Sequence, residues 1–192
     1  MLGGKYTKDY RLENTVDEKG RQVTTAVYVG RYYVFSASGD EVRRGRIAIL
    51  LSAAAAAVFM LCGLLFYDNR GFASQYYTIV PFFVCVFPLM YLFFGVNSAF
   101  AFTGGYPREK KDHTGDRIAK CSFLGMLFSG AALAGIAVSA VLKLTCIEER
   151  PLTLNSVFFI ASAVLTFVSF IVAFSNRKSV AMEERKDAPA GD

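Results

Sequence analysis

Ionisable side chains are missing from the longest stretches of this 192-residue chain. Four runs contain no Asp, Glu, Lys, Arg or His, and they cover 47–67, 71–107, 121–142 and 151–176. Ion-coupled transporters and proton relays normally place an ionisable residue inside the membrane. Intramembrane hydrolases need a general acid, a general base or a metal. The four runs argue against both classes of protein, and we expect the chain not to be an enzyme.

Histidine and cysteine are scarce as well. His113 is the only histidine and lies among lysines and aspartates, so we expect a solvated side chain rather than a ligand or a base. The four cysteines, Cys62, Cys85, Cys121 and Cys146, form no CxxC pair and no Cys/His cluster at the spacing of a metal site. Motifs for nucleotides, calcium, hydrolysis and nucleic acids are missing too. We therefore expect no cofactor, no metal and no nucleic-acid partner.

Apolar residues are abundant instead, since 54% of the chain is hydrophobic and only 19% is charged. This balance excludes intrinsic disorder and is typical of a protein that crosses a membrane several times. A helix needs about 20 residues to cross the hydrocarbon core, so the runs predict spans over about 47–67, 75–98, 118–142 and 153–175. The predicted fold class is an all-α membrane protein. It is a four-transmembrane-helix bundle over 47–175 with a small N-terminal cytoplasmic β-hairpin or meander.

Lysine and arginine divide unevenly between the segments that join the spans. The N-terminal segment holds nine, the segment between the second and third spans five, and the C-terminal tail four, whereas the other two loops together hold three. Positive charge collects on the cytoplasmic side. We therefore expect a multi-pass protein of a plasma membrane or bacterial inner membrane with both termini in the cytoplasm. Cys62 and Cys146 then lie toward the outside, where we expect free thiols, because a disulfide needs strict geometry.

The cytoplasmic head, residues 1–46, has the pattern of a small sheet. Residues 10–16 alternate apolar and polar side chains, 23–29 are rich in Thr and Val, and 32–35 are aromatic and β-branched. These segments predict a β-hairpin or a three-stranded meander. A sheet of this size cannot fold alone, so it either docks a cytosolic partner or caps the bundle.

Local signals mark both ends of the apolar region. Ser38 and Glu41 have the spacing of a capping box, which predicts that a helix begins there and continues into the first span. Residues 176–192 mix charged residues with Ala and Pro, and we expect a disordered cytoplasmic tail.

Small residues recur at helical spacing in the third and fourth spans. Such faces let membrane helices approach closely. They predict either packing inside the bundle or a homo-oligomer interface. The predicted helix-packing residues are Ser122, Gly125, Ser129, Ala132, Ser139, Ser162, Thr166 and Ser169.

Two further features have alternative interpretations. Pro81 and Pro88 should kink the second span, whose aromatic side chains then either line a pocket or face lipid. Arg43, Arg44 and Arg46 either contact anionic lipid head groups or only set the orientation.

The function that these patterns favour is a non-enzymatic accessory, scaffold or assembly subunit. Its expected partners are the lipid bilayer, a second copy or another membrane protein, and a cytosolic partner of the head. The alternative is a small oligomeric channel or facilitator for a neutral or apolar solute. The least favoured hypothesis is a lipid-acting enzyme that uses loop residues such as His113 or Asp116.

Overall fold

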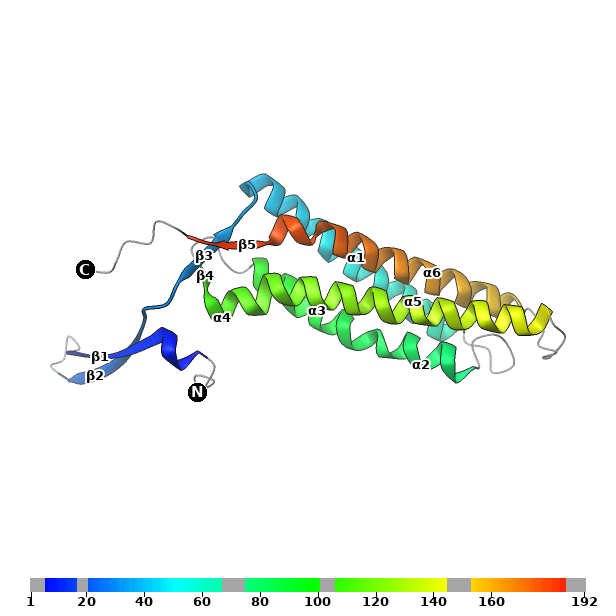
Figure 1. The fold of residues 1–192 in the computed structure, drawn as a ribbon, viewed down its shortest axis with the longest axis horizontal. Helices are drawn as coiled ribbons and strands as arrows, with labels where there is room; N and C mark the ends of the chain where they lie inside the picture. The colour runs from blue at the N-terminus through cyan, green and yellow to red at the C-terminus, as the bar shows by residue number, and fades with distance from the viewer. Residues whose placement is uncertain (1–5, 17–20, 67–74, 101–105, 145–152, 186–192) are drawn as a thin grey trace.

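The computed structural model describes residues 6–16, 21–66, 75–100, 106–144 and 153–185. It is mostly helical, and Figure 1 shows the helices as an elongated bundle with the β-strands gathered at one end. The helices are α1 (Gly39–Leu65), α2 (Tyr76–Val84), α3 (Val86–Phe100), α4 (Arg108–Lys111), α5 (Arg117–Leu144) and α6 (Leu154–Ser175). A π-helical turn, η3 (Asp112–Asp116), joins α4 to α5.

Four helical stretches are long and apolar enough to cross a membrane, and they cover Gly39–Leu65, Tyr76–Phe100, Arg108–Leu142 and Leu154–Val180. The predicted four-helix architecture is therefore confirmed. The first and third helical stretches begin before their apolar runs, because the polar residues that precede each run are helical as well. Cys146 and the predicted turn at 17–20 lie outside the described residues.

The start of α1 has the predicted capping box. The backbone N–H of Glu41 donates to the Ser38 hydroxyl at 3.4 Å, and the backbone N–H of Ser38 donates to the Glu41 carboxylate at 3.2 Å. These bonds satisfy backbone donors that have no partner within the helix. The helix therefore begins at Gly39, before the apolar run.

Each helix of the bundle packs against antiparallel neighbours. α1 contacts α6, α6 contacts α5, α5 contacts α2 and α3, and α3 returns to α1, which is an up-and-down arrangement. Phe82, Leu92, Phe159 and Phe170 are fully buried in the core. The outer faces are apolar as well, and their exposed side chains include Leu51, Leu61, Phe87, Val138 and Leu165. A water-soluble protein rarely exposes so continuous an apolar surface.

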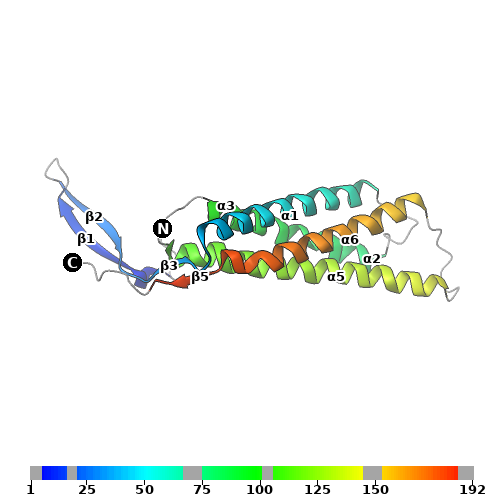
Figure 2. The ribbon, with the colours of Figure 1, turned by 90° about the horizontal axis from the view of Figure 1, so that it is seen from above.

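A β-hairpin forms most of the head. Strands β1 (Tyr10–Val16) and β2 (Gln22–Tyr28) pair antiparallel, with Leu12 opposite Ala26. They follow the short 3-10 helix η1 (Thr7–Asp9). Figure 2 shows this hairpin reaching beyond the end of the bundle. The hairpin that the sequence predicts is confirmed.

The third predicted strand, β3 (Tyr32–Phe35), pairs with segments from distant parts of the chain. It lies between β4 (Tyr106–Pro107) and β5 (Met182–Glu184), antiparallel to both. This second sheet ties the head to the start of α4 and to the C-terminal segment.

The prediction of disorder from residue 176 is wrong for 176–184. A 3-10 helix, η4 (Asn176–Val180), continues from α6 and leads into β5. Val180 and Met182 are buried, so this segment gains apolar burial that its polar composition did not suggest. Residues 186–192 lie outside the described part of the chain.

Candidate functional site

The structure buries all the small residues for which the sequence predicts helix packing. Gly125 faces α6 so closely that an added Cβ would overlap the ring of Phe170, which is itself fully buried. The face therefore meets another helix of the same protomer. The buried members are Ser122, Gly125, Ser129, Ala132 and Ser139 on α5, and Ser162, Thr166 and Ser169 on α6.

Several hydroxyls of these faces bond to their own helix. Ser122 donates to the carbonyl of Ile118 at 2.7 Å, Ser129 to that of Gly125 at 2.6 Å, and Ser169 to that of Leu165 at 2.8 Å. A hydroxyl satisfied in this way needs no partner from outside the helix. These three serines therefore act as small packing residues, whereas the Oγ1 atom of Thr166 on α6 is buried without a hydrogen-bond partner among the described residues.

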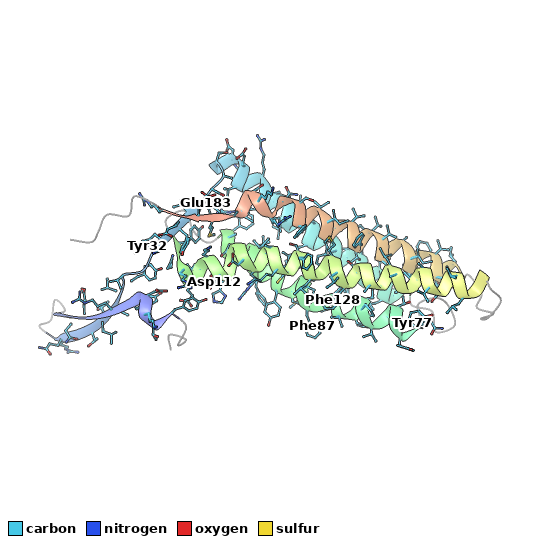
Figure 3. The ribbon with its side chains drawn as sticks, viewed as in Figure 1. Tyr32, Tyr77, Phe87, Asp112, Phe128 and Glu183 are labelled. Atoms are coloured by element: carbon cyan, nitrogen blue, oxygen red, sulfur yellow. The ribbon has the colours of Figure 1, made fainter. Side chains whose placement is uncertain are left out.

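The second span bends at Cys85, which separates α2 from α3. Pro81 lies inside α2, and Pro88 is buried in the first turns of α3. Three aromatic side chains around Cys85 are exposed, with Phe83 at 50%, Phe87 at 66% and Phe94 at 54%, whereas Phe82 is buried in the core. Figure 3 shows Phe87 pointing away from the bundle. This placement fits a face toward lipid rather than an enclosed pocket.

The three arginines at the start of α1 have different surroundings. Arg43 and Arg44 are exposed, where head groups can reach them. The guanidinium of Arg46 instead lies over the ring of Phe35 at 4.6 Å and near that of Phe100 at 5.8 Å. Burial raises the pKa of the nearby Tyr106 hydroxyl, whereas the charge of Arg46 and its hydrogen bond to Tyr106 act to lower that pKa. Arg46 therefore contacts aromatic rings of both β3 and α3.

The base of the hairpin is fixed to the bundle by tyrosine hydroxyls. Tyr28 donates to the carbonyl of Arg31 at 2.8 Å and accepts from the backbone N–H of Arg108 at 3.0 Å. Tyr6 donates to the carboxylate of Asp112 at 2.9 Å. Burial raises the pKa of Tyr28, and the Arg108 bond opposes this shift, so the phenol stays protonated at neutral pH.

A polar cavity of about 1040 Å³ lies between this base and the bundle end. Its walls come from η1, the link from β2 to β3, the segment α4–η3 and the first turn of α5. Figure 3 places Asp112 at the bundle end that faces the hairpin. The basic residues that line the cavity are Lys8, Arg31, Arg108, Lys111, Arg117 and Lys120, and the acidic ones are Asp9, Asp112 and Asp116.

The cations of the cavity differ in their contacts. Arg31 forms a salt bridge with Glu184 at 2.9 Å. Lys111 lies over the ring of Tyr33 at 4.5 Å. The guanidinium of Arg117 contacts the Nδ1 atom of His113. His113 is exposed, as the sequence predicts, and it lines this cavity.

Sequence reasoning missed the cavity because its walls come from distant segments. The basic residues of 108–120 have the pattern of orientation determinants, and nothing in the local sequence links them to Lys8 or Arg31. Among the residues that the structure describes, no three His, Cys, Asp or Glu side chains converge on a point that could hold a metal. The six Lys and Arg side chains of the cavity offer cationic groups to an anion. Comparisons with protein-family models, with curated proteins and with solved structures found no match to this chain.

Proposed function

We propose that this chain is a multi-pass integral membrane protein that acts as a non-enzymatic accessory or scaffold subunit. In this proposal four helical spans anchor it, both termini are cytoplasmic, and the β-hairpin is the element that a cytosolic partner contacts. The apolar outer faces of the helices support the anchoring role. The uneven division of Lys and Arg between the connecting segments supports the orientation.

The observation that carries the proposal is the exposure of the hairpin. Leu12 is 70% exposed, Val23 45% and Val27 36%, so the described part of the hairpin keeps its apolar side chains outside any core. An isolated two-stranded ribbon gains little stability from its own packing. Here, however, hydrogen bonds from Tyr28 and Tyr6 hold its base in place. A ribbon that is fixed at its base and exposed along its length is better suited to bind a cytosolic partner than to cap the helical bundle.

Site-specific photo-crosslinking in native membranes tests this proposal. A photoreactive residue at Leu12, on the hairpin, should form an adduct with one discrete protein. The matched control is the same residue at Leu61, which is 60% exposed on α1 and should label lipid alone. The exposed substitution Leu12→Glu should remove the corresponding complex from a native gel and leave the protein in the membrane fraction.

Two results would contradict the docking role. One is a hairpin adduct that is indistinguishable from the lipid adduct at Leu61. The other is a native complex that Leu12→Glu leaves intact. Flux of a neutral solute such as glycerol through proteoliposomes of the purified chain, above that of empty liposomes, would favour the channel alternative instead.

A further inference from the structure

The cavity at the hairpin base carries more positive than negative charge. Six Lys or Arg side chains and three Asp side chains line it, and Arg31 is the one cation of this set with a salt bridge in the described part of the chain. Lys8, Arg108 and Lys120 have no carboxylate within bonding distance among the described residues. Like charges that face a common space repel each other, and a concave surface concentrates their field. An anion in the cavity would relieve this repulsion.

The types of cationic side chain in the cavity indicate which class of anion it would bind. Arginine presents a planar fork of donors that matches phosphate oxygens, and lysine adds a mobile point charge. Arg108 and Arg117 supply two forks, while Lys8, Lys111 and Lys120 supply point charges. We propose that the cavity binds a phosphate-bearing anion.

The size and position of the cavity agree with such a ligand. A volume of about 1040 Å³ is slightly above the roughly 300–1,000 Å³ typical of small-molecule sites, so the cavity has room for such a ligand. Lys120 and Arg117 lie in the first turn of α5, where the apolar run begins. In a membrane this wall lies at the depth of the head groups. The phosphate can therefore belong to a lipid head group or to a soluble compound.

The ligand would connect two parts of the molecule. Lys8 and Arg31 belong to the base of the hairpin, whereas Arg108, Lys111 and Lys120 belong to the helical segments. A π-helical turn, which is frequent at functional sites, supplies Asp112, His113 and Asp116 to the same wall. An anion held by both groups fixes the hairpin relative to the bundle and slows hydrogen exchange at its base.

The test uses the full-length protein in nanodiscs, with two arms that separate the sources of phosphate. In the first arm inorganic pyrophosphate is added to protein in phosphatidylcholine discs, with sodium chloride at equal ionic strength as the control. In the second arm phosphatidic acid replaces part of the phosphatidylcholine. Thermal unfolding reports binding, and amide hydrogen exchange over 22–33 reports the hairpin base. A response in the first arm identifies a soluble source, and a response in the second alone identifies a lipid.

Two triple variants with equal changes of charge provide the matched comparison. The cavity variant combines Lys8→Gln, Arg108→Gln and Lys120→Gln, all at exposed side chains of the cavity wall. The control variant combines Arg11→Gln, Lys178→Gln and Arg185→Gln, which are exposed and lie outside the cavity.

We expect the cavity variant to weaken binding of the responding probe at least tenfold, and the control variant less than twofold. The tyrosine contacts at the hairpin base do not involve the three changed side chains, so the fold should survive. Equal weakening by both variants would reduce the effect to general surface charge and overturn the proposal. Absence of a response in both arms would overturn it as well.

Discussion

Gly125 provides the sharpest test of how the bundle packs. An added methyl group at this position would overlap the ring of Phe170, and that ring is fully buried. Overpacking of this kind costs about 1–3 kcal/mol. Replacing glycine by alanine in a helix returns up to about 1 kcal/mol through propensity. Gly125→Ala should therefore lose about 1–2 kcal/mol, and Gly125→Leu should lose more.

The same helix offers a matched control. At Gly130 an added Cβ would lie 3.4 Å from the ring of Phe167, which is an ordinary contact. Gly130→Ala should therefore be neutral or slightly stabilising. A conservative change at the exposed Leu124, such as Leu124→Ile, should also cost little. Unfolding of the purified protein by SDS in mixed micelles measures the free energy of each variant.

A double-mutant cycle isolates the contact between α5 and α6. In a Phe170→Ala background the ring is absent, so Gly125→Ala should cost less than it does in the wild type. Residues in direct contact normally couple by about 0.5–3 kcal/mol. If Gly125→Ala and Gly130→Ala unfold alike and the cycle shows no coupling, α5 does not pack on α6 in this way.

Three further predictions concern the head and the thiols. Tyr28→Phe removes two hydrogen bonds and should speed amide exchange over 22–28, a local loss of about 1 kcal/mol. Burial raises the pKa of Tyr28 above its usual value of 10.0. The stabilisation that the protonated Tyr28 hydroxyl gives the fold is therefore complete below that pH and is lost as the pH rises through the pKa of the folded protein. Spectrophotometric titration of the wild type against Tyr28→Phe checks the direction of this pKa shift. Arg46→Ala should lower the thermal midpoint because the contact over Phe35 is lost, whereas the exposed Arg43→Ala should not. Mass spectrometry without reduction should find both Cys62 and Cys146 alkylated, and a linked peptide pair would disprove the free thiols.

The helices were predictable because their signals are local. An uninterrupted apolar run of about 20 residues has few alternatives to a membrane-spanning helix. The Ser38–Glu41 capping box depends on residues three apart, and the alternation over 10–16 depends on neighbours. Each of these features can be recognised without knowledge of the rest of the chain.

The second sheet was not predictable because its pairing is entirely long-range. Tyr33 pairs with Tyr106 on one side and with Glu184 on the other. Strands of two and three residues are too short to show a periodic pattern. The order in 176–184 depends on the same pairing, so composition alone could not indicate it.

The surroundings of individual charged residues could not be predicted from the sequence either. Arg46 is one of three arginines within four positions, and only the fold shows that it alone packs on Phe35. The cavity similarly combines Lys8 with Lys120, which come together because the tyrosines dock the hairpin base on α4 and η3. Tertiary contacts decide which surface charges become neighbours.

Cysteine accessibility tests most directly whether the bundle crosses a membrane with the head in the cytoplasm. Single cysteines replace Glu183 and Asn155, which are exposed at opposite ends of the bundle, in a chain whose native cysteines are changed to serine. In intact cells a membrane-impermeant maleimide should label Asn155→Cys at once and Glu183→Cys only after permeabilisation. Labelling of Glu183→Cys in intact cells, or equal labelling of both positions, would contradict the arrangement.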